Sequence, residues 1–143
     1  STHEGPNAIR MAAAALVRRY REDGRRLAGF GHCLHKRDPR AVRLLEIAEE
    51  EGVGAAWIAR ARALEQALAD AASTPLPLNV DGAIAVVVLA LELPMEVANG
   101  LFMIARLPGL IAHVREERTT QRPMRHIDQT AARYAGKEDP SDA

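Results

Sequence analysis

Glycine and proline divide this chain into segments that are otherwise rich in strong helix formers. A glycine readily ends a helix and a proline favours its first turn, so each break marks a boundary between helices. At Asp38-Pro39 the aspartate supplies an N-cap and the proline occupies the first helical position. The breaks predict six helices, over about residues 7–21, 39–51, 55–72, 80–93, 94–107 and 109–117.

The apolar segment 80–93 admits two interpretations. Its Val86-Val87-Val88 triplet favours a strand, whereas its length and the absence of another strand candidate favour a buried helix. We therefore expect an all-α fold. The expected organisation is one helical domain over residues 1–118, followed by a polar, extended C-terminal arm over 119–143.

The pattern of apolar side chains predicts which faces of two of these helices are buried. In the second helix the apolar stripe lies opposite three glutamates, and in the third the apolar positions are spaced for one inward face. The predicted inward residues are Leu44, Leu45, Ile47 and Ala48 in the second helix, and Ile58, Leu64 and Leu68 in the third.

Composition excludes several function classes. The 143 residues carry 19 Lys+Arg and 19 Asp+Glu, and only 3% are aromatic, so neither a global basic charge nor aromatic platforms are present for nucleic acid. One cysteine, Cys33, excludes an intrachain disulfide and a four-cysteine zinc site, and no metal site is predicted. The longest strictly apolar run, residues 83–91, is too short to span a membrane. We expect a cytoplasmic protein.

The core must be aliphatic and rich in alanine, because 48% of residues are hydrophobic but few are aromatic. Small side chains bury little apolar area each, so a chain of this size is only modestly stable alone. Together with the apolar helices near residues 83–91 and 101–114, this predicts a symmetric homodimer.

Basic residues concentrate around a glycine-containing loop. Between Arg18 and Arg43 there are nine basic residues against three acidic ones, and the loop 28–37 lies within this stretch. Flexible backbone N–H groups flanked by cations suit a phosphate-bearing ligand. The alternative is an ordinary solvated helix face.

Three side chains are candidates for chemistry. His32, in a loop that a ligand can approach closely, either donates a hydrogen bond to a substrate carbonyl or is simply solvated. Asp81, at the head of an apolar helix, is either an N-terminal cap or a general base whose pKa is raised by apolar neighbours. Arg106, at the end of an apolar helix, either interacts with the helix dipole or binds a carboxylate.

Taken together, these segments resemble the citrate synthase superfamily. GFGHCLHKRDPRA (29–41) resembles its histidine signature, NVDGA (79–83) its aspartate motif, and GLFMIARLPGLIAHVREER (100–118) the helix pair that follows. RPMRHIDQTAARYAG (122–136) resembles the terminal arm of that family. HKRDPR, NVDGAIA and RPMRHI are more similar to the short citryl-CoA lyase-like branch than to the longer citrate synthases.

The resemblance implies Claisen-type formation or cleavage of a carbon–carbon bond, with acetyl-CoA plus oxaloacetate or with citryl-CoA. It implies that His32 hydrogen-bonds the oxaloacetate carbonyl and that Asp81 removes a methyl proton from acetyl-CoA. The substrate carboxylates would be bound by Arg40, Arg106 and Arg122, the last reaching into the other subunit of a dimer. Coenzyme A would be held by the loop residues Gly29, Phe30, Gly31 and Lys36, with no metal involved.

One part of the family pattern is absent from this sequence. The enol-stabilising histidine lies in an upstream segment that the chain almost entirely lacks, and His3 is the only histidine before His32. The sequence is therefore expected to be truncated at its N-terminus relative to the family. Two other readings remain: a non-catalytic coenzyme A or carboxylate-binding module, such as a truncated remnant, and a purely structural helical domain.

Overall fold

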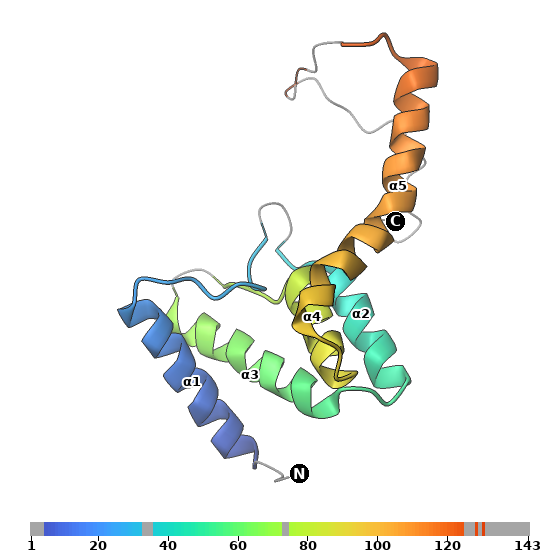
Figure 1. The fold of residues 1–143 in the computed structure, drawn as a ribbon. Helices are drawn as coiled ribbons and strands as arrows, with labels where there is room; N and C mark the ends of the chain where they lie inside the picture. The colour runs from blue at the N-terminus through green and yellow to red at the C-terminus, as the bar shows by residue number, and fades with distance from the viewer. Residues whose placement is uncertain (1–4, 33–35, 73–74, 125–127, 129, 131–143) are drawn as a thin grey trace, which may run out of the picture. The chain divides into compact units, whose positions relative to one another are not determined.

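The structure, a computed structural model, describes residues 5–32, 36–72, 75–124, 128 and 130. It divides into two compact units, residues 1–105 and 106–143, and the boundary falls within the last helix. Figure 1 shows the helices. They are α1 (Pro6–Glu22), α2 (Pro39–Glu50), α3 (Ala55–Ala71), α4 (Val80–Ala90), a short 3-10 helix η1 (Met95–Val97) and α5 (Ala98–Thr120).

The first unit is built from two helix pairs, α1 with α3 and α2 with α4, which are joined by contacts between α3 and α4. α1 packs along α3, α2 packs against α4, and α3 also contacts α4 (Figure 1). The α2, α3 and α4 faces meet in one core of mainly small and aliphatic side chains. It contains Ala41, Leu45, Ala48, Ile58, Ala61, Leu78, Ala83 and Val86, with Phe30, Leu44, Trp57 and Val87 packed at its edge. This core holds the ends of α2 and α4 in place.

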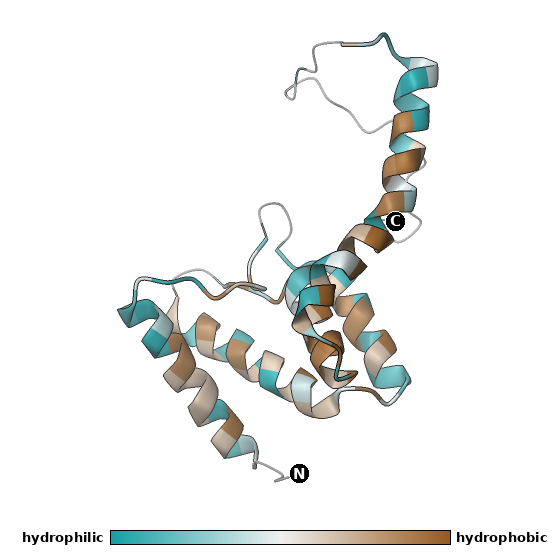
Figure 2. Cartoon of the chain, in the orientation of Figure 1, coloured by the Kyte–Doolittle hydropathy of each residue, from teal (hydrophilic) through white to brown (hydrophobic). Residues whose placement is uncertain are grey.

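The predicted fold class is confirmed: the described residues are helical, and their only strand-like feature is an isolated antiparallel bridge between Phe30 and Leu78. The Val86-Val87-Val88 triplet lies in α4, where Val88 is fully buried. Burial between α2 and α3 therefore outweighs the strand propensity of valine here. Figure 2 shows α4 as a predominantly hydrophobic helix.

Two details of the sequence prediction are wrong. The predicted six helices are five α-helices and one 3-10 helix, because Pro108 does not end α5 but lies inside it. Proline removes one helical hydrogen bond, and the carbonyl of Ile104 that loses its partner belongs to a helix with no buried residues, so it is not left inside a core. Ile47 is 41% exposed rather than inward, because the core-facing positions of α2 are Ala41, Leu45 and Ala48.

The arm predicted for residues 119–143 lies mostly outside the described residues. Within the described part, α5 continues to Thr120, and Arg122 and Met124 are exposed. The division at 118 therefore stays a prediction.

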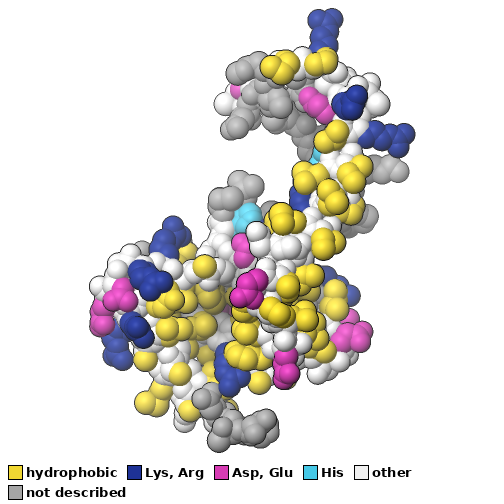
Figure 3. Space-filling model, viewed as in Figure 1, with side chains coloured by type: hydrophobic (Ala, Val, Ile, Leu, Met, Phe, Trp, Pro, Cys, Tyr) yellow, Lys and Arg dark blue, Asp and Glu magenta, His cyan; other side chains and the backbone are white. Residues whose placement is uncertain are grey.

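Large apolar side chains are exposed along η1 and α5. No residue of α5 is buried, and Ile104 is 70% exposed. Figure 2 colours several turns of α5 as hydrophobic, and Figure 3 shows hydrophobic side chains on the surface of this helix. By length and composition alone, the helical stretch over residues 95–120 is long and apolar enough to cross a membrane. Sequence reasoning missed it because Arg106 and other polar residues interrupt its apolar runs. An exposed apolar surface of this kind is typical of an interaction site.

Candidate functional site

The loop that carries His32 is anchored to the segment that leads into α4. The backbone N–H of Gly31 donates to the Pro77 carbonyl at 2.7 Å, and that of Asn79 donates to the Gly29 carbonyl at 3.0 Å. These bonds flank the Phe30–Leu78 bridge and place the loop beside the first turn of α4.

Two glycines allow this close approach. Gly29 has φ +85°, and a Cβ there would lie 2.9 Å from the Cα of Gly82. Conversely, a Cβ on Gly82 would collide with the Gly29 carbonyl oxygen. Since neither position has room for a side chain, the loop backbone and the α4 backbone are in direct contact.

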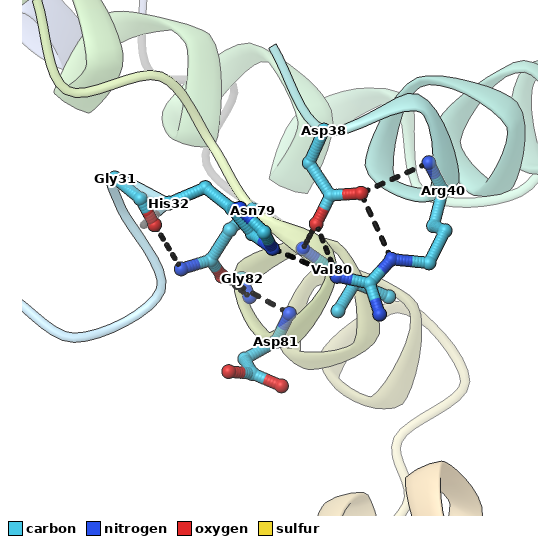
Figure 4. Close-up of polar contacts among 8 residues, drawn as sticks. All are labelled: Gly31, His32, Asp38, Arg40, Asn79, Val80, Asp81 and Gly82. Atoms are coloured by element: carbon cyan, nitrogen blue, oxygen red, sulfur yellow. Dashed lines mark hydrogen bonds and ion pairs between the residues drawn. The ribbon is translucent and has the colours of Figure 1, made fainter. Parts of the chain in front are cut away.

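Asn79 is the N-cap of α4 and also contacts the loop (Figure 4). Its Oδ1 accepts hydrogen bonds from the backbone N–H groups of Asp81 at 3.1 Å and Gly82 at 3.2 Å. Its Nδ2 donates to the carbonyl of Gly31 at 2.8 Å. One amide side chain therefore links the residue before His32 to the first turn that carries Asp81.

Asp38 joins the ends of α2 and α4. Its carboxylate, 1% exposed as a residue, caps α2 by accepting from the Arg40 backbone N–H at 3.1 Å, and its Oδ2 accepts from the Val80 backbone N–H at 2.9 Å. Nε and Nη2 of Arg40 each donate to it at 3.0 Å. The cap predicted at Asp38-Pro39 is confirmed.

These hydrogen bonds hold Asp38 in its charged form. The side-chain hydrogen bonds from Arg40 are the largest cause and lower the pKa of Asp38 from 3.8 to about 2, against the opposing effect of burial. The same contact raises the pKa of Arg40, and the charge of Asp81 contributes in the same direction. Asp38 is thus a buried anion that a bidentate guanidinium satisfies.

Arg40 extends from this pair to His32. Its Nη2 lies 3.3 Å from Nε2 of the imidazole, and because a guanidinium only donates, Nε2 of His32 acts as the acceptor in this contact. The Arg40 side chain is 50% exposed, and its Nη1 has no hydrogen-bond partner among the described residues. The Arg40 guanidinium can therefore bind Asp38 through Nε and Nη2 and an incoming carboxylate through Nη1.

Asp81 lies at the second position of α4, and its carboxylate is exposed (Figure 4). Of the two interpretations from sequence, capping by Asp81 is wrong, because Asn79 provides the cap and Asp81 contributes only its backbone N–H. The Asp81 side chain is exposed rather than covered by the apolar residues of α4. In the first unit the structure brings together His32, Arg40, Asp81, Gly29, Phe30 and Gly31.

The remaining predicted residues are exposed. Lys36 lies at the end of the loop, whose residues 33–35 are outside the described part, as is His3. Arg106 and Arg122 belong to the second unit. The Arg106 guanidinium lies over Gly109, where a Cβ would meet it. In the described ranges no group of three or more His, Cys, Asp or Glu side chains is arranged to hold a metal ion.

Sequence reasoning missed the two residues that organise this site. Asp38 was predicted only as a helix cap, and Asn79 was assigned no role. An asparagine directly before an apolar helix is a cap signal in its own right, and its position two residues before Asp81 could have identified it. Their contacts across the fold, to Val80 and Gly31, have no local sequence signature.

Comparisons with known proteins identify the family. Residues 4–127 match the family "Citrate synthase, C-terminal domain". The citrate synthase of Corynebacterium glutamicum is 43% identical over 104 residues, which are 68% of this chain and 24% of that protein. The citrate synthase of Haloferax volcanii is 32% identical over 120 residues, which are 81% of this chain and 30% of that protein. The chain thus spans about a quarter to a third of these relatives.

Two solved structures share the fold. The citryl-CoA lyase from Hydrogenobacter thermophilus superposes with a TM-score of 0.71 and 32% identity, over 91% of this chain and 53% of that one. The citrate synthase from Thermotoga maritima gives a TM-score of 0.67 and 25% identity, over 93% and 37%. Since the family match covers most of the chain, this chain belongs to the citrate synthase family.

Proposed function

We propose that the chain forms part of an active site that makes or cleaves a carbon–carbon bond of an acyl-CoA thioester, as citrate synthase or citryl-CoA lyase. The substrates are acetyl-CoA with oxaloacetate, or citryl-CoA. The observation that carries the proposal is the convergence of His32, Arg40 and the Asp81 helix turn, joined by the Arg40–His32 contact at 3.3 Å and by Asn79.

Each residue type suits a step of this chemistry. The exposed carboxylate of Asp81 can accept a proton from the carbon next to the thioester. His32 can donate a hydrogen bond to the keto oxygen of oxaloacetate as charge develops there. Arg40 offers its Nη1 to a substrate carboxylate while Asp38 fixes the other side of its fork.

Coenzyme A binds the loop that begins at Gly29 in this proposal. Backbone N–H groups in that loop and the Lys36 ammonium provide hydrogen bonds and positive charge for its phosphates. Salt weakens such binding because the groups are exposed. Coenzyme A is a substrate carrier here, and the proposal involves no metal.

The assembled site further uses a second copy of the chain. In a symmetric homodimer the partner covers the exposed apolar side chains of α5 and η1. Those of α5 are Leu101, Ile104, Leu107, Leu110, Ile111 and Val114. Arg106 binds a substrate carboxylate, and Arg122 reaches the site of the partner. Arg106 also lies in the middle of the apolar stretch, where a membrane would disfavour its charge. The location is cytoplasmic.

The decisive experiment is exchange of acetyl-CoA methyl protons with deuterated water, followed by NMR on the complete native polypeptide with an oxaloacetate analogue present. We expect Asp81→Asn to lower exchange by about 10²–10⁴-fold, the usual contribution of a general base. Stability should change little, because Asn79 makes the cap. Asp23→Asn, an exposed carboxylate at the end of α1, is the matched control.

Wild-type exchange that persists unchanged with Asn at position 81 would contradict the base assignment. Tight binding of coenzyme A by the complete protein with neither exchange nor condensation nor cleavage would instead support the non-catalytic binding module.

A further inference from the structure

Asn79 lies between the two residues to which the proposed function assigns proton transfer and carbonyl polarisation. We propose that Asn79 is a positioning residue, whose amide sets the separation of His32 from Asp81 by bonding both backbones at once. The inference rests on the proposed function and adds to it a residue that touches no reacting atom.

The contact on the loop side acts on the orientation of His32. The carbonyl of Gly31, which accepts from Asn79 Nδ2 at 2.8 Å, belongs to the same planar peptide unit as the backbone N of His32. Gly31 has φ +81°, a conformation available mainly to glycine, so the chain turns at this point. Holding that carbonyl restrains the peptide plane and so, together with φ of His32, the direction in which the His32 side chain leaves the backbone.

The contact on the helix side acts on Asp81. Oδ1 of Asn79 accepts the backbone N–H groups of Asp81 and Gly82, at 3.1 and 3.2 Å, and so defines where the first turn of α4 begins. Both ends of the amide are used with their correct polarity, since Oδ1 only accepts and Nδ2 only donates. No other single side chain in the described part bonds both the loop and the start of α4 in this way.

The two tasks of Asn79 can be separated by substitution. Aspartate and serine cap helices about as well as asparagine, but neither can donate to the Gly31 carbonyl from an amide. Asn79→Asp also places a charged oxygen beside that carbonyl, whereas Asn79→Ser adds no charge. Asn79→Ala removes both the cap and the link.

The experiment measures kcat and KM of the complete native polypeptide, with urea unfolding and the His32 Hε1 NMR signal recorded for the same samples. We expect Asn79→Ser to have an unfolding midpoint only slightly below wild type, because it keeps the cap and loses one hydrogen bond, and Asn79→Asp to lose more because its charge faces the Gly31 carbonyl. In both, kcat should fall by about 10-fold or more, since small misplacements of catalytic groups are costly. The His32 signal should shift in both. Asn79→Ala should lose stability as well as kcat.

The control is Asn7→Asp, which makes the same change at an exposed position in the first turn of α1. Normal kcat and an unshifted His32 signal in stable Asn79→Ser and Asn79→Asp proteins would overturn the positioning role and leave a cap alone. A shifted His32 signal in a protein whose wild type has no thioester activity would support the geometric link and reject the proposed function, so the two failures are distinguishable.

Discussion

The buried carboxylate of Asp38 makes a quantitative prediction about stability and pH. Folding lowers the pKa of this group from 3.8 to about 2, mainly through the Arg40 hydrogen bonds. The difference corresponds to roughly 2 kcal/mol of stabilisation at neutral pH, from the linkage between proton binding and folding. Because the folded-state pKa is the lower one, this stabilisation is complete above the unfolded value and is lost as the pH falls through about 2.

The perturbation is Asp38→Asn, which keeps the size of the side chain and one acceptor oxygen for Val80 but cannot carry the charge that Arg40 binds. We expect it to lower the free energy of unfolding by about 2 kcal/mol at pH 7, consistent with losing charge-assisted hydrogen bonds. At pH 2 and below, wild-type Asp38 is itself becoming neutral, so the difference between the two proteins should shrink toward zero.

The assay is urea unfolding followed by circular dichroism at pH 7, 4, 3 and 2. Asp23→Asn, which removes an exposed carboxylate, corrects for the general effect of net charge. A stability difference between wild type and Asp38→Asn that stays constant from pH 7 to pH 2 would refute the reasoning, because it would show that the Asp38 charge contributes nothing.

Three further predictions concern packing, ligand and assembly. Gly82→Ala should destabilise strongly, because its Cβ would collide with the Gly29 carbonyl, whereas Gly100→Ala, with open space around it, should be neutral or stabilising by up to about 1 kcal/mol; thermal unfolding compares them. Lys36→Ala should weaken coenzyme A binding by about 1 kcal/mol or more, with a smaller salt dependence, and calorimetry that detects no change would remove Lys36 from the site. Ile111→Glu should convert the dimer to monomer in sedimentation, and a wild-type monomer at micromolar concentration would contradict the α5 interface.

The features that the sequence predicted correctly are those with a local physical cause. Asp38-Pro39 starts α2 because capping and the fixed φ of proline act within a few residues. The length of the apolar segment after Asn79 indicated a buried helix, and this segment forms α4, which buries Ala83, Val86 and Val88. The glycine loop around His32 and the position of Asp81 at the head of an apolar helix made both residues candidates, and Asn79 links the residue before His32 to the backbone of Asp81.

The features that were missed depend on contacts between distant segments. The residues near Pro108 do not indicate whether the helix continues through this proline. Continuation depends on whether the Ile104 carbonyl, which loses its helical hydrogen bond, can bond water instead. Asp81 looked like a cap because it is the first charged residue of an apolar helix, but the cap of that helix lies two residues earlier, at Asn79. The Asp38–Val80 bond depends on how α2 packs against α4, which no local pattern encodes.

The separation in sequence of the linked residues has a consequence for biosynthesis. Asn79 bonds Gly31 across 48 residues, and Asp38 bonds Val80 across 42. At a translation rate of about 5–20 residues per second, the loop that holds Gly31 waits between roughly 2 and 10 seconds before its partner is synthesised. During that interval α1 and α3 can pack together, but α2 lacks α4, the helix against which it packs, and the loop lacks the segment that it bonds. A ribosome-bound chain that ends before residue 79 should therefore expose this loop, and a protease should cleave it there more readily than in the complete chain.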